Sequence, residues 1–210
     1  MIAIVDYGVG NLAGVRKAFA AVGARAELVR DPAGLRDASA IVLPGVGNFG
    51  HCSREFHRFG FANPVRDARG RGVPILGICV GMQLLFDGSE EDAGEPGLGF
   101  YRGSVVKLTG VPRVPQIGWN AVRTIGDHPW LRDVADGDNF YFVHSYAAAP
   151  TESVTLGTVD YGGERLAIVG SDGMLGVQFH PEKSGANGLR LLRSFATADA
   201  GVVASAGNCC

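Results

Sequence analysis

The first half of the chain alternates short apolar runs with longer segments of helical periodicity. The apolar runs predict buried strands over residues 2–5, 27–29, 40–43 and 74–78. Between them, apolar side chains recur every three or four positions, which predicts helices over residues 11–22, 49–61 and 64–70. Strands separated by helices of this length are typical of βαβ units. The pattern therefore predicts a parallel sheet that is covered by helices on both faces.

The pattern changes after about residue 97. Runs of strand character then follow closely, with turn residues between them: residues 104–108, 120–124, 140–146, 153–161, 166–170 and 174–179. This spacing favours hairpins and hence an antiparallel extension of the sheet, and a final helix is predicted over residues 188–198. We interpret residues 1–200 as one domain and residues 201–210 as a flexible C-terminal tail.

Composition narrows the class of protein. Apolar residues make up 46% of the chain and charged residues 19%, which excludes an intrinsically disordered chain. The net charge of −2 without a basic tract predicts no nucleic-acid partner. The apolar run 74–82 is too short for a bilayer, the first residues do not resemble a signal peptide, and the four cysteines show no disulfide spacing. We expect a cytoplasmic protein with no membrane partner.

The sharpest chemical motif is Gly77-Ile78-Cys79-Val80-Gly81, which follows a predicted strand. It has the form of a nucleophile elbow with cysteine in the central position. The flanking glycines allow close backbone approach, the following helix favours a thiolate, and the Val80 N–H group is a natural oxyanion donor. The alternative is a buried structural cysteine between two packing glycines.

A partner for this cysteine follows the last predicted strand, in His180-Pro181-Glu182. In an extended segment, residues two apart project to the same side, so the imidazole and the carboxylate can pair. Cys79 is then the nucleophile, His180 the base and Glu182 the acceptor that orients the base. The alternative is a strand that ends in a polar turn.

Two glycine-rich turns remain to be interpreted. Pro44-Gly45-Val46-Gly47 follows the third predicted strand and should emerge beside Cys79, where the Val46 N–H group is a second candidate oxyanion donor; a plain βα turn fits equally well. Residues 7–13 match a dinucleotide-binding fingerprint, but Asp6 would repel a pyrophosphate. The sequence holds no P-loop and no metal-ligand spacing, so we expect no cofactor and no metal.

Taken together, these motifs resemble the class I (triad) glutamine amidotransferases, and among them the glutaminase subunits of imidazole glycerol phosphate synthase. The matching segments run in order through residues 1–197 and comprise residues 7–11, 44–47, 77–83, 116–120, 141–146 and 180–184. Anthranilate-type and GMP-type members usually carry Pro-Gly-Pro-x and Cys-Leu-Gly-His-Gln. Val46, Val80 and Met82 therefore favour the histidine-pathway branch.

The resemblance implies a flavodoxin-like three-layer fold and hydrolysis of glutamine through a γ-glutamyl thioester on Cys79, with His180 as base and then acid. It implies that glutamine is held by Gly47, Gln83, His144, Ser145 and Tyr146. It also implies a heterodimer with a (β/α)₈-barrel cyclase subunit. That subunit would take the ammonia to make imidazole glycerol phosphate and AICAR in histidine biosynthesis.

Family members of this kind are nearly silent alone and are switched on by the partner, with the Pro44–Gly47 turn involved in the switch. The interface residues that the resemblance implies are Gly8, Asn11, Trp119, Tyr141 and Lys183. Two other interpretations stay open: a cytosolic Cys-His hydrolase on the same fold, such as a peptidase-like relative, and a non-enzymatic flavodoxin-like binding module. A binding module needs neither the elbow nor His-Pro-Glu, and a lone hydrolase needs no exposed patch at Trp119.

Overall fold

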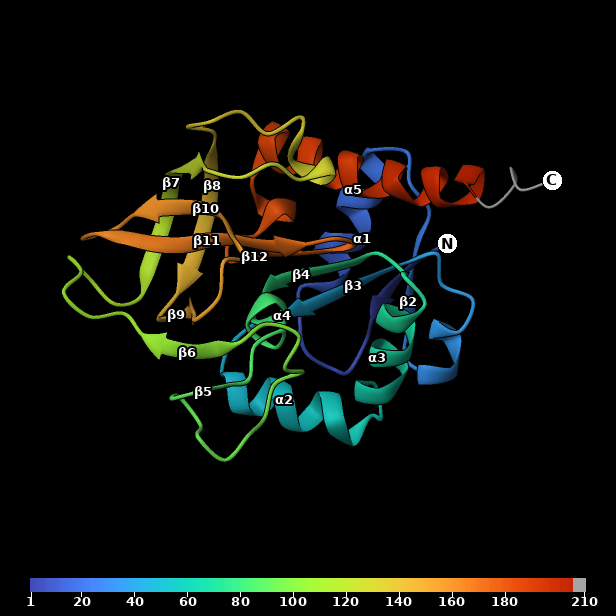
Figure 1. Ribbon diagram of the computed structural model, residues 1–210, viewed down its shortest axis with the longest axis horizontal. Helices are drawn as coiled ribbons and strands as arrows, with labels where there is room; N and C mark the ends of the chain where they lie inside the picture. The colour runs from blue at the N-terminus through green and yellow to red at the C-terminus, as the bar shows by residue number, and fades with distance from the viewer. Residues whose placement is uncertain (206–210) are drawn as a thin grey trace.

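A nine-stranded sheet forms the centre of the protein; its computed structural model describes the backbone of residues 1–205 and the side chains of residues 1–197. The strand order is β2-β1-β3-β4-β12-β11-β10-β7-β8 (Figure 1). One half of the sheet is parallel and consists of β1 (Ile2–Val5), β2 (Ala26–Val29), β3 (Ala40–Gly45), β4 (Ile75–Cys79) and β12 (Met174–Val177). The other half is antiparallel and consists of β11 (Glu164–Ser171), β10 (Thr155–Asp160), β7 (Gln116–Thr124) and β8 (Asn139–His144). The predicted α/β fold with an antiparallel extension is confirmed.

Helices cover both faces of the parallel half, as the pattern predicted (Figure 1). α1 (Leu12–Ala21) and α5 (Gly185–Ser205) pack together on one face, where the rings of Phe19 and Phe195 lie 6.1 Å apart. α2 (Phe49–Arg58) and α3 (Ala62–Gly70) cover the other face. The remaining helices are single turns, namely α4 (Val80–Gln83) and the 3₁₀ helices η1 (Pro32–Leu35), η2 (Pro129–Leu131) and η3 (Pro181–Lys183).

The C-terminal helix is longer than the sequence suggested. α5 begins and ends outside the predicted range 188–198 and reaches Ser205. The tail expected from residue 201 therefore begins within this helix, and residues 206–210, with Cys209 and Cys210, lie outside the described residues. In the described part of the chain, no helix is both long enough and apolar enough to cross a membrane.

The predicted strand over residues 140–146 is wrong in one respect, because the chain changes sheets within it. β8 pairs with β7 as far as His144, and β9 (Tyr146–Pro150) then pairs with β6 (Gly103–Lys107). β6, β9 and the two-residue β5 (Gly88–Ser89) form a separate three-stranded sheet. The junction carries two consecutive polar residues, His144 and Ser145, which interrupt the apolar run but do not reveal which sheet each part joins. β5 is too short to produce a pattern.

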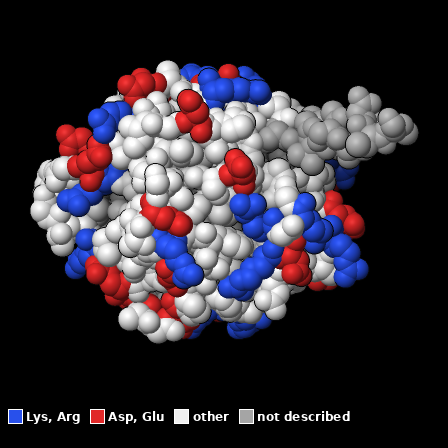
Figure 2. Space-filling model, in the orientation of Figure 1, with Lys and Arg blue, Asp and Glu red and all other residues white. Residues whose placement is uncertain are grey.

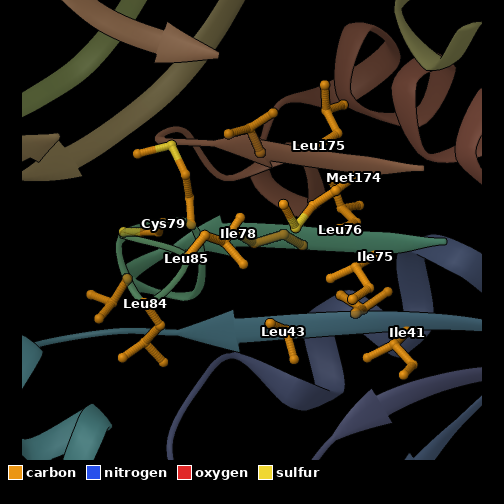
Figure 3. Close-up of a cluster of buried hydrophobic side chains, with 14 of the residues drawn as sticks. Ile41, Leu43, Ile75, Leu76, Ile78, Cys79, Leu84, Leu85, Met174 and Leu175 are labelled. Carbon is orange, nitrogen blue, oxygen red and sulfur yellow. The ribbon is translucent and has the colours of Figure 1, made fainter. Parts of the chain in front are cut away.

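The core between β3, β4 and β12 places three chain segments at one edge of the sheet. Aliphatic side chains of these strands and of the segment after α4 pack into a buried cluster, with Cys79 at the end of β4 (Figure 3). The register pairs Gly45 with Cys79 and Ile78 with Val177. The carboxyl ends of the three strands therefore meet at the same edge, which is where ligands bind in open α/β sheets.

The surface shows no large region of one charge on the face seen in Figure 2. Lysine and arginine side chains are interspersed there with aspartate and glutamate. Ion pairs near the surface include Arg54 with Asp92 and Arg58 with Glu55.

We expect the aromatic cluster beneath the last strand to carry a large share of the stability. Phe179 stacks on Phe140 with 4.0 Å between ring centroids and lies 5.6 Å from the ring of Phe142, and all three side chains are fully buried. Phe179→Ala should lower the free energy of unfolding, measured by urea denaturation, by about 3–5 kcal/mol. The control Ile125→Ala, at a site that is 50% exposed, should change it by about 0.5 kcal/mol or less. Equal effects of the two substitutions would contradict this role.

Candidate active site

Cys79 lies at a strained turn between β4 and α4. Its backbone has φ 54° and ψ −113°, and it is the one non-glycine residue with positive φ among the described residues. Such a conformation costs about 1–3 kcal/mol and persists only where the surroundings enforce it. The sharp turn that the motif predicts is therefore present.

The surroundings that enforce the turn are backbone atoms. A Cβ atom at Gly81 would lie 1.8 Å from the carbonyl oxygen of Leu43, and one at Gly45 would lie 2.7 Å from the nitrogen of Gly81. The end of β3 and the elbow can approach this closely only because both positions are glycine. The turn after β3 and the turn at Cys79 are thus in direct backbone contact.

The helix that follows Cys79 is shorter than the sequence suggested. α4 has four residues, Val80–Gln83, so few peptide dipoles are aligned behind the sulfur. The helix-dipole effect expected at this position is correspondingly small.

His180 and Glu182 form a buried pair close to this cysteine. Nδ1 of His180 donates to Oε1 of Glu182 over 2.9 Å, and the two side chains are 2% and 1% exposed. The spacing works differently from the prediction, because residues 181–183 form the 3₁₀ helix η3 rather than an extended segment. Ser184 fixes the turn, since its hydroxyl donates to the His180 carbonyl oxygen over 2.6 Å.

His180 and Glu182 each shift the pKa of the other toward its charged form. Burial lowers the pKa of His180, but the Cys79 sulfur and the Glu182 carboxylate outweigh it and raise that pKa to about 9. Burial raises the pKa of Glu182, but His180 and the Asn11 amide outweigh it, so the net shift is downward. Nε2 of His180 makes no hydrogen bond among the described atoms. At neutral pH the site therefore holds an imidazolium between the sulfur and a carboxylate.

A cavity of about 630 Å³ opens beside Cys79 and collects most of the predicted site residues. Its wall includes two of the three triad residues, both candidate oxyanion residues and all five candidate glutamine-binding residues: Cys79, His180, Val46, Val80, Gly47, Gln83, His144, Ser145 and Tyr146. Two of the predicted interface residues, Asn11 and Lys183, also line it. Glu182 lies behind His180 and does not line the cavity, and Gly8, Trp119 and Tyr141 lie outside its wall.

The site also contains two residues that the sequence did not reveal: Glu91 lines the cavity, and Gln178 is buried beside Cys79. Glu91 reaches the cavity from the loop after β5, and its carboxylate accepts the Phe49 N–H group at the start of α2 over 2.8 Å. Gln178 is fully buried and donates from Nε2 to the Cys79 sulfur over 3.7 Å. Position 178 belongs to the predicted strand 174–179, but a lone buried glutamine in a strand gives no signal of its role.

Several polar groups in and behind the cavity wall hydrogen-bond to one another. Nε2 of Gln83 donates to the Tyr146 carbonyl oxygen over 3.0 Å and to Oε1 of Gln178 over 3.1 Å. Nδ1 of His144 lies 2.8 Å from the Tyr146 carbonyl oxygen, while its buried Nε2 makes no hydrogen bond among the described atoms. Burial lowers the pKa of His144 to about 4, so this side chain is neutral.

The turn at Pro44–Gly47 is held from both sides. The Tyr7 hydroxyl donates to the Pro44 carbonyl oxygen over 2.6 Å, and the Cys52 thiol donates to the Val46 carbonyl oxygen over 3.3 Å. Burial raises the pKa of Tyr7 well above its usual range and that of Cys52 to about 11, so both groups keep the proton they donate. The peptide between Gly45 and Val46 lies between these two anchored carbonyl groups.

Apolar and aromatic side chains lie exposed on the strands next to the cavity. Ile117 and Trp119 project from the same face of β7 and are 58% and 55% exposed. The Trp119 ring lies 6.1 Å from that of Tyr141, and the Lys183 ammonium lies 5.8 Å from the Tyr141 ring centroid. We call Ile117, Trp119, Tyr141 and Lys183 the rim patch. Among the side chains described, no group of three or more His, Cys, Asp or Glu residues is arranged to hold a metal ion.

Comparison with known proteins places this geometry in a family. A family model described as glutamine amidotransferase class-I matches residues 3–198. The imidazole glycerol phosphate synthase subunit HisH of Thermococcus kodakarensis is 50% identical over 200 residues, which cover 93% of this chain and 98% of that one. The HisH subunit of Salinibacter ruber is 46% identical over 204 residues, covering 93% and 94%.

Solved structures agree on the fold. A crystal structure of a glutamine amidotransferase superposes with a TM-score of 0.76 at 19% identity, covering 95% of this chain and 98% of the other. PurLQS from Thermotoga maritima gives a TM-score of 0.73 at 21% identity, covering 94% and 97%.

The chain therefore belongs to the class-I glutamine amidotransferase family, whose flavodoxin-like fold it shares. Within this family it falls among the HisH subunits of imidazole glycerol phosphate synthase.

The unfolding free energy should depend on pH through His180 in a defined direction. Folding raises the pKa of His180 from 6.5 to about 9, so the folded protein binds this proton more tightly than the unfolded chain. The resulting stabilisation, on the order of 3 kcal/mol, is complete below the unfolded pKa and is lost as pH rises through the folded pKa. Urea denaturation should show that the stability advantage of the parent over His180→Gln shrinks between pH 6.5 and about 9.

His144 supplies a control of opposite sign. Folding lowers its pKa from 6.5 to about 4, so its contribution is present above pH 6.5 and is lost as pH falls through about 4. His144→Gln should change the acid side of the stability profile and leave the alkaline side unchanged. A parent advantage over His180→Gln that stays constant across the alkaline range would contradict the buried charge pair.

Proposed function

We propose that this chain hydrolyses glutamine to glutamate and ammonia through a thioester on Cys79, and that it delivers the ammonia to a cyclase subunit. The observation that carries the proposal is that Cys79 and protonated His180 share the wall of one cavity, with Glu182 hydrogen-bonded to His180 from behind that wall. This arrangement is that of a cysteine nucleophile with an oriented acid–base group.

In the proposed reaction, His180 first donates a proton and then accepts one. The Cys79 thiolate attacks the side-chain amide carbon of glutamine, and the proton on Nε2 of His180 moves to the amide nitrogen, which leaves as ammonia. His180, now neutral, takes a proton from water, and the resulting hydroxide attacks the thioester. Glutamate leaves as the thiolate and the imidazolium are restored. Throughout, Glu182 accepts a hydrogen bond from the Nδ1–H group of His180, so that Nε2 is the nitrogen left to exchange protons with the substrate and water.

The proposed oxyanion site consists of the N–H groups of Val80 and Val46. Val80 follows the nucleophile directly, so its N–H group lies where the carbonyl oxygen of the substrate acquires charge. The anchored carbonyl groups of Pro44 and Val46 confine any rotation to the Gly45–Val46 peptide between them. Rotation of this single peptide unit would turn the second donor toward the oxyanion or away from it.

The proposed substrate contacts follow from the charge of the cavity wall. The Glu91 carboxylate is the acceptor that suits the ammonium group of glutamine, and Gly47, Ser145 and Tyr146 surround the remaining space. His144 is neutral, and its Nε2 atom, which makes no hydrogen bond among the described atoms, is available to hydrogen-bond the substrate. Gln83 acts by supporting the Tyr146 carbonyl and Gln178 rather than by reaching into the cavity.

The proposed partner is a (β/α)₈-barrel cyclase subunit that forms a heterodimer with this chain in the cytoplasm. The relatives are named as subunits of a synthase, which implies a second subunit. The rim patch, together with Gly8 and Asn11, is the surface we assign to that contact, because exposed aromatic and aliphatic side chains next to a reactive cavity favour a protein partner. The same patch favours this proposal over a hydrolase that acts alone.

Cys79→Ser should abolish glutamine hydrolysis while leaving the fold intact. A serine hydroxyl is scarcely ionised where a thiolate is needed, so we expect the rate of ammonia release to fall by about a thousandfold or more. A glutamine analogue that carries an electrophilic carbon should alkylate Cys79 in the parent. Mass spectrometry should locate the label there and not on Cys52, whose thiol is buried and has a raised pKa. Full activity of Cys79→Ser, or a label found mainly on Cys52, would overturn the nucleophile.

Partner binding should act mainly on kcat. If the Val46 donor is turned away in the free chain, its recruitment should raise kcat by about a hundredfold or more, while the KM for glutamine changes little. Steady-state glutaminase kinetics on the chain alone, and with the cyclase subunit and its nucleotide ligand, measure both constants. A free chain that turns over at the full rate of the complex would contradict the rotating turn and leave the nucleophile assignment untouched.

A further inference from the structure

Asn11 stands at the point where α1 begins, yet its side chain does not cap the helix. An asparagine at this position ordinarily accepts a hydrogen bond from an N–H group of the first turn. Here the side chain makes no capping bond, and Nδ2 instead donates to Oε1 of Glu182 over 3.1 Å, across 171 residues of chain. The Asn11 amide therefore binds the Glu182 carboxylate, and α1 lacks the stabilisation that a side-chain cap would give.

Glu182 receives its described side-chain hydrogen bonds on a single oxygen. Oε1 accepts from both Nδ1 of His180 and Nδ2 of Asn11, whereas the buried Oε2 makes no hydrogen bond among the described atoms. A carboxylate held by His180 alone could rotate about its side-chain bonds. The second donor, arriving from α1, fixes which oxygen faces the imidazole.

Gly14 provides the space for this contact. A Cβ atom at position 14 would lie 2.3 Å from Nδ2 of Asn11 and 2.7 Å from its Cγ. Gly14 lies inside α1, where glycine is less favourable than any residue except proline. Helix α1 is thus less stable than it could be at two positions, its N-cap and Gly14. Both positions permit the same contact between Asn11 and Glu182.

We propose that Asn11 is a positioning residue of the triad, which holds the Glu182 carboxylate against Nδ1 of His180, and that Gly14 makes room for it. This inference rests on the proposed function and adds to it a residue that the resemblance assigned only to the partner interface. The contact with Glu182 is directed inward, so it acts whether or not the outer side of Asn11 also touches a partner.

Replacement of Asn11 by alanine and by aspartate separates positioning from a structural role. Aspartate has the same shape and is a good helix cap, so a structural role predicts that Asn11→Asp is milder than Asn11→Ala. A positioning role predicts the reverse order, because a second carboxylate beside Glu182 would repel it. In the complex with saturating cyclase subunit, we expect Asn11→Ala to lower kcat about tenfold with KM nearly unchanged, and Asn11→Asp to lower kcat further.

Gly14→Ala tests the contact without changing either polar residue. Its methyl group should displace the Asn11 amide and lower kcat as much as Asn11→Ala does, with no further loss in the double variant. Its melting temperature should not fall, since alanine favours the helix. The matched control is Gly70→Ala at the end of α3, where a Cβ atom would meet nothing within 4 Å; it should leave kcat at the parent value.

Two results would overturn the inference: an Asn11→Asp complex at least as active as Asn11→Ala, or a Gly14→Ala complex with the parent kcat. Either can occur while the parent hydrolyses glutamine and is labelled on Cys79, in which case the proposed function stands. A parent complex without glutaminase activity would overturn both together.

Discussion

The negative charge on Glu182 is the constraint to which the rest of the site is fitted. Its side chain is 1% exposed, and a carboxylate removed from water to this degree costs several kcal/mol unless donors surround it. The donors are His180, which follows β12, and Asn11, which precedes α1. The carboxylate therefore joins two segments from opposite ends of the chain at one edge of the sheet. The same carboxylate helps to raise the pKa of the neighbouring His180 imidazole.

The position of Cys79 is set by backbone contacts more than by side chains. The register pairs Gly45 with Cys79, and the glycines at 45 and 81 let two turns touch where any Cβ atom would collide. Side chains enter mainly as anchors, with Tyr7 and Cys52 on either side of one peptide. The two turns are thereby held in fixed contact, and the Gly45–Val46 peptide lies between the two anchored carbonyl groups.

The sequence predicted the features that leave a local signature. Alternation of apolar strands and periodic helices was enough for the parallel half of the sheet, and the glycines around Cys79 revealed the elbow because a sharp turn needs them nearby. Contacts set by tertiary structure left no such trace. Glu91 lies on an irregular loop, and Gln178 is one polar residue directly after the apolar strand β12. The bond from Asn11 to Glu182 joins positions whose separation no periodicity encodes.

The crossing of the chain from one sheet to the other at Ser145 has a consequence for how the cavity responds to change. His144 ends a strand of the large sheet and Tyr146 begins a strand of the small one, and both lie in the cavity wall. This part of the cavity wall therefore lies where the nine-stranded sheet meets the three-stranded sheet. The shape of the cavity depends on the angle between the two sheets. Substitutions that change how β6 and β9 pack against the larger sheet can thus alter which ligands fit the cavity. No substitution near the Cys79 sulfur is needed.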